Sequence, residues 1–106
     1  MIAILWTYRV EPSWAALFEA IYGPEGDWAQ LFRQADGYRG TELLVESEGR
    51  YLTIDRWESA EAFRLFKQRF ADAYALLDTR CEALTEAQEF IGEFEVYASD
   101  RIKPST

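Results

Sequence analysis

Segment 51–63 constrains the fold of this chain more than any other, because a strand passes there directly into a helix. Residues 51–57 are rich in aromatic and β-branched side chains that alternate between two faces, which is typical of a strand. Ser59 is suited to cap the following helix, and Glu61 places a negative charge in its first turn, where the helix dipole favours it. Trp57, at the corner between them, is expected to line a cleft between the sheet and this helix, and a place in the core is the alternative.

Composition favours one globular domain. The chain has 106 residues, of which 49% are apolar and 16% aromatic, so we expect a single domain over 1–98 and a polar tail over 99–106. We expect no membrane span and no leader, because no apolar run is long enough and none follows a basic start. A net charge of −8 without a run of Lys or Arg argues against nucleic acid and membranes as partners. One cysteine fits a reducing compartment, and hence a cytoplasmic protein.

Two missing residue types narrow the chemistry further, because the sequence contains neither histidine nor asparagine. No imidazole is available as a base near neutral pH or as a ligand for haem, zinc or copper. The six glycines are scattered and form no phosphate-binding loop. Carboxylates alone would suffice for Mg²⁺, but no acidic cluster has a recognisable ligand spacing. The sequence therefore predicts a protein without a cofactor or a bound metal.

The first half of the chain predicts one strand and two helices. Segment 2–10 is β-branched and aromatic, with apolar residues on both alternating faces, which indicates a strand covered on both sides. A helix is expected to start near Pro12 and to end at Gly23, with an apolar stripe made of Trp14, Leu17, Phe18 and Ile21. Asp27 and Gln30 fit a capping box for a second, short helix. The apolar face of that second helix is formed by Trp28, Leu31 and Phe32.

The second half predicts a hairpin, a long helix and a last strand. Strands over 41–47 and 50–57 are joined by a turn at Glu48 and Gly49. After Ser59, apolar residues recur every three or four positions, which predicts a helix that is bent near Arg69. This stripe consists of Phe63, Phe66, Phe70, Tyr74, Leu77, Cys81 and Leu84. Residues 85–88 are expected to cap one more turn, and segment 91–98 is expected to form the last strand.

The order of these elements is the split β-α-β pattern of ferredoxin-like folds. The expected class is α+β, with a four-stranded antiparallel sheet and helices on one face. The first strand then leaves apolar residues uncovered on the other face, which soluble monomers avoid. A second copy of the same sheet would cover them, so the pattern predicts a homodimer.

With this order, the chain resembles the antibiotic biosynthesis monooxygenase-like family of dimeric α+β barrels. The resemblance rests on segments 37–44 (GYRGTELL) and 57–63 (WESAEAF), and on Ile91-Gly92 at the start of the last strand. It covers nearly the whole domain and implies the fold more strongly than the activity. Members include cofactor-free oxygenases that convert polycyclic aromatic phenols to quinones, and haem-degrading oxygenases.

The resemblance carries some functional residues over and not others. Trp57 matches the tryptophan that the family places at the end of this strand, facing the pocket. Haem-degrading members use a histidine on the following helix, near Phe66 here, and an asparagine on the first strand, near Trp6 and Thr7 here. Cofactor-free members also tend to use an asparagine beside the tryptophan. The chain has neither residue type, so it departs from both patterns.

The remaining candidates for chemistry form an aromatic pocket with few polar groups. Trp57 and Asp55 are the candidate catalytic residues, with Asp55 as the base if desolvation raises its pKa. The candidate substrate-binding residues are Tyr51, Tyr8, Phe66, Phe70 and Tyr74. Arg56 and Arg9 are candidates to hold a phenolate anion, although strand alternation places Arg56 on the face opposite Asp55.

Two hypotheses about function remain open from the sequence. One is a cofactor-independent monooxygenase that acts on a small aromatic or polyketide-like compound. The other is a non-catalytic dimeric module that binds an apolar small molecule or serves only assembly. The resemblance favours the first, whereas the lack of histidine and asparagine favours the second.

Overall fold

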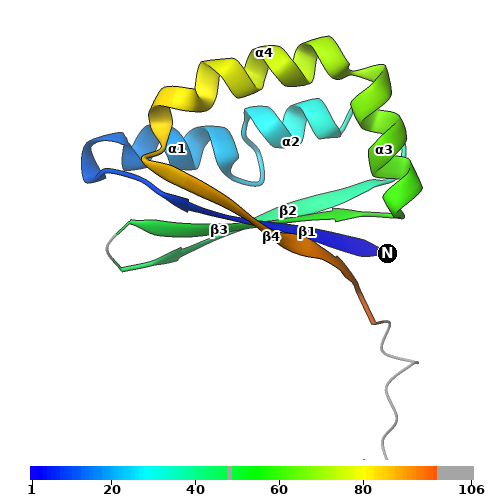
Figure 1. Cartoon of the computed structure of the whole chain (residues 1–106), viewed down its shortest axis with the longest axis horizontal. Coiled ribbons are helices and arrows are strands. Elements are labelled where there is room, and N and C mark those ends of the chain that lie inside the picture. The colour runs from blue at the N-terminus through cyan, green and yellow to red at the C-terminus, as the bar shows by residue number, and fades with distance from the viewer. Residues whose placement is uncertain (48, 98–106) are drawn as a thin grey trace, which may run out of the picture.

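The computed structural model describes residues 1–47 and 49–97 as a layer of strands beneath a layer of helices (Figure 1). Along the chain the elements are β1 (Ile2–Arg9), η1 (Pro12–Trp14), α1 (Ala15–Tyr22), α2 (Asp27–Phe32), β2 (Tyr38–Glu46), β3 (Arg50–Trp57), α3 (Ala60–Arg69), α4 (Ala71–Cys81), η2 (Glu82–Leu84) and β4 (Ala87–Glu95). The predicted tail 99–106 and Glu48 of the predicted turn lie outside the described residues.

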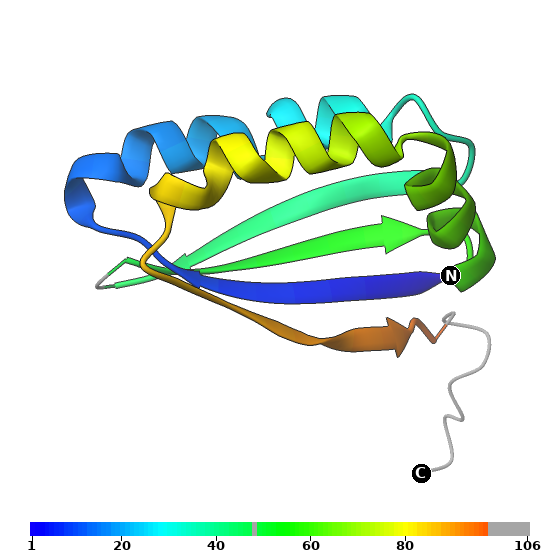
Figure 2. The ribbon, with the colours of Figure 1, turned by 45° about the horizontal axis from the view of Figure 1, so that its top comes forward.

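The four strands form one antiparallel sheet in the order β2-β3-β1-β4. β1 and β3 are therefore central, and β2 and β4 are the edges. The helices lie together on one face of this sheet (Figure 2). This arrangement confirms the predicted ferredoxin-like α+β fold.

Alternation along the two central strands determines which side chains face the helices. Ile4 and Tyr8 of β1 are buried on this face, and they lie opposite Asp55 and Tyr51 of β3. Trp57, at the end of β3, faces the same way and is fully buried. The core is therefore a predominantly aromatic layer between the sheet and the helices.

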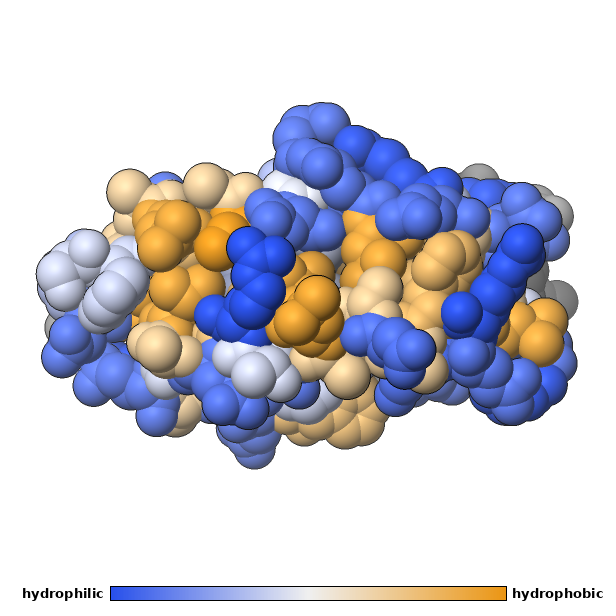
Figure 3. Space-filling view, turned by 90° about the horizontal axis from the view of Figure 1, so that it is seen from above, coloured by the Kyte–Doolittle hydropathy of each residue, from blue (hydrophilic) through white to orange (hydrophobic). Residues whose placement is uncertain are grey.

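The other face of the sheet is also rich in apolar side chains. Leu5 of β1 lies opposite Ile54 of β3, and both are partly buried. On the edge strands, Leu44 is 44% exposed and Phe94 is 48% exposed. The single chain leaves this face uncovered, whereas the apolar surface of the helix layer is broken up by polar and charged side chains (Figure 3).

The corner after β3 follows the local sequence signals. The Ser59 side chain accepts a hydrogen bond of 3.0 Å from the backbone N–H of Ala62, so Ser59 caps α3 as predicted. The predicted bend near Arg69 is a break at Phe70, whose φ of −112° and ψ of 29° separate α3 from α4. In the described part of the chain, no helix is long and apolar enough to cross a membrane.

The predicted apolar stripe of the first helix is partly wrong. The backbone after Pro12 forms a 3-10 turn, and α1 begins only at Ala15. The side chains that face the sheet are Phe18 and Tyr22, which are four residues apart on α1. Trp14 and Leu17, which the stripe had included, are exposed at 42% and 45%.

Both expected capping boxes beyond that helix are wrong. Gly26 is the N-cap of α2, and Asp27 lies inside its first turn. Gln30 instead donates a hydrogen bond of 2.9 Å to the carbonyl of Glu25. Between η2 and β4 there is no further helical turn, because pairing with β1 draws residues from Ala87 onward into β4.

β2 contains a bulge near its start, close to the pocket. Tyr38 pairs with Trp57 and Gly40 pairs with Arg56, so Arg39 is the extra residue. Gly40 has a φ of +114°, which glycine adopts without steric cost. Beyond the bulge, Thr41 lies directly opposite Asp55.

Candidate functional site

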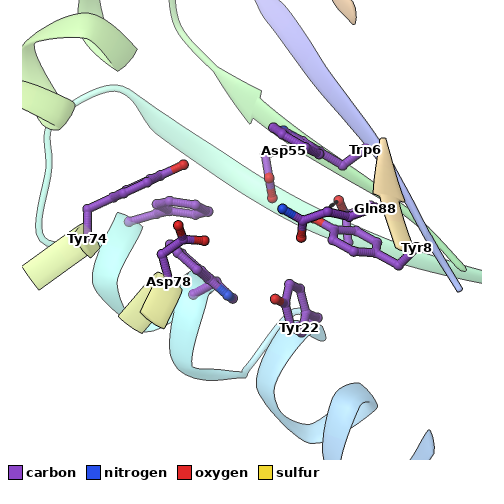
Figure 4. A pocket seen from close by; sticks show the side chains of 10 residues that line it. Trp6, Tyr8, Tyr22, Asp55, Tyr74, Asp78 and Gln88 are labelled. Carbon is purple, nitrogen blue, oxygen red and sulfur yellow. Dashed lines mark hydrogen bonds between the residues drawn. The ribbon is translucent and has the colours of Figure 1, made fainter. Parts of the chain in front are cut away.

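A cavity of about 140 Å³ lies between the sheet and the helices (Figure 4). It is lined by Trp6 and Tyr8 of β1, Tyr22 of α1, Trp28 and Phe32 of α2, Thr53 and Asp55 of β3, Tyr74 and Asp78 of α4, and Gln88 of β4. Six of these ten side chains are aromatic. The site is therefore a chamber of aromatic side chains and several polar groups, a combination found in small-molecule sites.

The two central strands position the inner wall of this cavity. Trp6 lies opposite Thr53 in the sheet register, and Ile4 lies opposite Asp55. Since alternate residues share a face, Thr53 and Asp55 both point toward the helices. Asp55 is thus held on a central strand, beside the aliphatic side chain of Ile4.

Burial changes the acidity of Asp55. Desolvation disfavours its charged form and raises its pKa from an ordinary 3.8 to about 6, while the hydrogen bond from Thr41 opposes this rise. The Thr41 hydroxyl donates to Asp55 Oδ1 over 2.6 Å. Because Thr41 has only one hydroxyl proton, the Tyr38 hydroxyl is the donor in its own 2.5 Å bond to Thr41 Oγ1. Asp55 is therefore a carboxylate near its titration point, at the end of a chain of hydroxyl donors.

The tyrosines around the cavity are neutral hydrogen-bonding groups. Burial raises the pKa values of Tyr8, Tyr22 and Tyr74 above the ordinary range. The Thr53 hydroxyl donates a long hydrogen bond of 3.4 Å to the Tyr8 hydroxyl. These phenols therefore keep their protons at neutral pH and are able to donate to a bound ligand.

Among the predicted site residues, Asp55, Tyr8 and Tyr74 line the cavity together. Trp57 lies behind its wall, fully buried, with its ring centroid 5.5 Å from that of the lining residue Phe32. Within the described residues, Trp57 Nε1 has no hydrogen-bond partner. The structure thus places Trp57 in the core, whereas the expectation had placed it on the cleft wall.

The other predicted binding residues lie farther along the aromatic core. Phe66 is buried against Trp57, with centroids 5.2 Å apart, and Phe70 stacks on Phe66 at 5.4 Å. Tyr51 packs on Phe18 at 4.7 Å, and its hydroxyl donates to Glu19. These three side chains therefore support the layer that contains the cavity without being among its lining residues.

Sequence reasoning missed several lining residues. Thr53 follows from strand alternation, since it lies two positions before Asp55. Asp78 follows from helix spacing, since it lies four positions after Tyr74. Trp28 was assigned only to the apolar face of a short helix, and Gln88 was assigned to a helix cap instead of a strand.

Metal binding and thiol chemistry are both poorly supported by the described residues. No group of three or more His, Cys, Asp or Glu side chains within 1–47 and 49–97 is placed to hold a metal. Cys81 is buried, and burial raises the pKa of its thiol, which disfavours the nucleophilic thiolate. Cys81 is therefore a core residue, as its place on the helical stripe predicted.

The sheet with helices on one face and an aromatic cavity between the layers defines a small ferredoxin-like domain with an internal chamber. The family model described as antibiotic biosynthesis monooxygenase matches residues 1–89. The chain belongs to this family. The resemblance inferred from its motifs is thus confirmed.

Solved structures of similar fold include two oxygenases from Streptomyces. SnoaB, a cofactor-independent oxygenase from Streptomyces nogalater, aligns in a mutant form with a TM-score of 0.76 and 22% identity, covering 92% of this chain and 94% of that one. The ActVA-Orf6 monooxygenase from Streptomyces coelicolor, in complex with nanaomycin D, aligns with a TM-score of 0.73 and 17% identity, covering 97% and 91%. At these identities the likeness establishes a shared fold. No curated protein sequence matches the chain.

Proposed function

We propose that this protein is a cofactor-independent monooxygenase that oxidises a small aromatic or polyketide-like phenol in the cavity beside Asp55. The observation that carries the proposal is the raised pKa of Asp55, about 6, in an aromatic chamber. A carboxylate with this pKa is a far better base for a phenol than an exposed one, and it is largely ionised at neutral pH. Family membership supports the reaction class.

In the proposed mechanism, Asp55 removes the phenolic proton and the resulting phenolate reacts with O₂. A ring carbon forms a bond to oxygen, giving a peroxide that loses water and leaves a quinone. One oxygen atom of O₂ enters the product and the other leaves as water, so O₂ supplies all the oxidising equivalents. The neutral hydroxyls of Tyr8, Tyr22 and Tyr74 are available to donate to the developing anion.

The aromatic walls support this chemistry in two ways. Flat rings such as Trp28 and Phe32 offer stacking surfaces for a flat substrate. A flat substrate packed against these walls would also displace water, which competes for reactive oxygen intermediates. The volume of about 140 Å³ lies below the usual range for ligand pockets, so we propose a substrate of few fused rings.

Trp57 has a supporting place in this proposal. Its indole is packed against Phe32 and Phe66, with centroids 5.5 and 5.2 Å away. Phe32 lines the cavity. We propose that Trp57 keeps the ring of Phe32 in position, and that it affects the substrate only through its contact with Phe32.

The proposed active form is a homodimer in which two sheets pack through their outer faces. The exposed side chains of Leu44 and Phe94 support this, since a second copy would remove the same apolar surface from water twice. Interfaces of obligate dimers bury roughly 2,000 Å² or more in total. Light scattering at micromolar concentration tests the dimer, and a monomer mass would refute it.

The second candidate function is a non-catalytic dimeric module that binds an apolar small molecule or serves only assembly. It is favoured by the absence of histidine and asparagine from the whole sequence, because family members with known chemistry draw on those residue types. Both candidates use the same fold, so only turnover separates them.

Oxygen uptake with a panel of anthrone-like and naphthol-like phenols tests the proposed reaction. We expect consumption by the wild-type protein and a loss of about 100-fold in rate for Asp55→Asn, which keeps the shape but removes the base. Asp72→Asn, on the exposed first turn of α4, is the matched control and should keep the rate. Binding without oxygen consumption would favour the ligand-binding module, and neither signal would favour assembly alone.

A further inference from the structure

The charged groups that line the cavity are of one sign. Asp55, which is partly buried, lies on β3, and Asp78, which is exposed, lies on α4 on the opposite side of the cavity. Figure 4 shows both carboxyl groups turned toward the space between the sheet and the helices. The ten lining residues include no Lys and no Arg.

Three arginines of neighbouring elements pair with glutamates outside the cavity. Arg33 and Arg39 pair with surface glutamates at 3.0 and 2.8 Å, and Arg56 pairs with Glu42 of β2. Lys67 Nζ lies 5.4 Å from the ring centroids of Phe63 and Tyr74, but Lys67 does not line the cavity. The chamber therefore offers a bound anion no lining counter-charge.

The uncharged part of the lining also favours a positively charged ligand. The faces of aromatic rings carry negative electrostatic potential and attract organic cations, most strongly when water is excluded. Six of the ten lining residues carry aromatic rings, among them Trp6, Tyr8 and Trp28. The whole chain adds to this, because its net charge of −8 raises the local concentration of cations.

We infer that the cavity selects flat aromatic substrates that carry a positively charged amine, held by Asp78 and the ring faces, and rejects substrates that carry a carboxylate. The inference rests on the proposed function for the site itself, since it assumes that the substrate occupies this cavity. A positive charge on the substrate would also assist the removal of the phenolic proton. When Asp55 accepts a phenolic proton, the negative charge moves to the substrate, and an ammonium group on the same molecule compensates it.

The test compares three redox-inert probes of matched size by titration calorimetry: 2-naphthylmethylamine, 2-naphthalenemethanol and 2-naphthoate. At low salt we expect the amine to bind the wild-type protein about fivefold tighter than the alcohol, and the carboxylate to bind about fivefold weaker. Asp78→Asn should shrink the ratio between amine and carboxylate by about fivefold while leaving the alcohol unchanged. Asp72→Asn removes the same charge from the same helix, outside the cavity lining, and should leave the ratio intact.

Each result distinguishes the inference from the proposed function. Equal binding of all three probes, or tighter binding of the carboxylate, overturns charge selection while leaving an aromatic site in place. An unchanged ratio in Asp78→Asn overturns the role of Asp78. If none of the probes binds, the cavity is not an aromatic ligand site, and the proposed function fails together with the inference.

Discussion

Asp55→Asn should make the protein more stable at neutral pH while removing its proposed base. Burial raises the pKa of Asp55 from 3.8 to about 6, so the folded state binds more protons than the unfolded state between these values. Stability from this group is therefore full below the unfolded pKa and is lost as the pH rises through about 6. A difference of this size corresponds to about 3 kcal/mol at neutral pH. Asparagine never ionises, and its carbonyl oxygen still accepts the Thr41 hydroxyl.

Urea denaturation of both proteins measures this effect. We expect the stability advantage of Asp55→Asn to grow by about 1.4 kcal/mol between about pH 5 and about pH 8, because the folded carboxyl ionises within that window. Protein concentration must be fixed, since a dimer makes the midpoint concentration-dependent. Asp72→Asn is the control and should show no growing advantage. An advantage for Asp55→Asn that is absent, or that does not change with pH, would refute the idea that this carboxyl is desolvated.

Three further substitutions test the site and the fold. Thr41→Val removes the hydroxyl that donates to Asp55, so the acid limb of the oxygen-uptake rate should move up by about one pH unit; an unmoved limb would contradict the hydrogen-bond argument. Ser59→Ala removes the N-cap of α3 and should lower the free energy of unfolding in urea by about 1 kcal/mol. Trp57→Ala empties a fully buried site and should cost about 3–5 kcal/mol in the same assay, whereas Trp14→Ala, at 42% exposure, should cost far less.

The fold was predictable where apolar residues recur at regular spacing, because those residues are buried on one face of the element. The alternation over 51–57 and the spacing of three or four residues after Ser59 are both found in the structure as β3 and α3. Each of these elements buries one face in the core between the sheet and the helices. Prediction failed where a local signal competed with pairing. Residues 85–88 fit a capping box, yet they enter or adjoin β4, because hydrogen bonds to β1 outweigh a local cap.

The candidate site was only partly accessible from the sequence. Asp55 and Tyr8 follow from strand alternation, and Tyr74 follows from the helical stripe. Trp28 could not be placed at the cavity, because the cavity exists only where α1, α2 and α4 lie over the sheet, and the separation of these helices depends on tertiary packing.

The bulge in β2 has a consequence for how the length of this chain can vary. Arg39 is the additional residue between the pairs formed by Tyr38 and Gly40, and regular pairing resumes at Thr41 opposite Asp55. Deleting Arg39 would straighten the edge strand and leave both flanking pairs unchanged. Insertions and deletions at this one place can therefore accumulate during divergence while the hydroxyl that bonds to the base keeps its position. Homologues are expected to differ in length here more readily than in the hairpin-proximal half of the same strand.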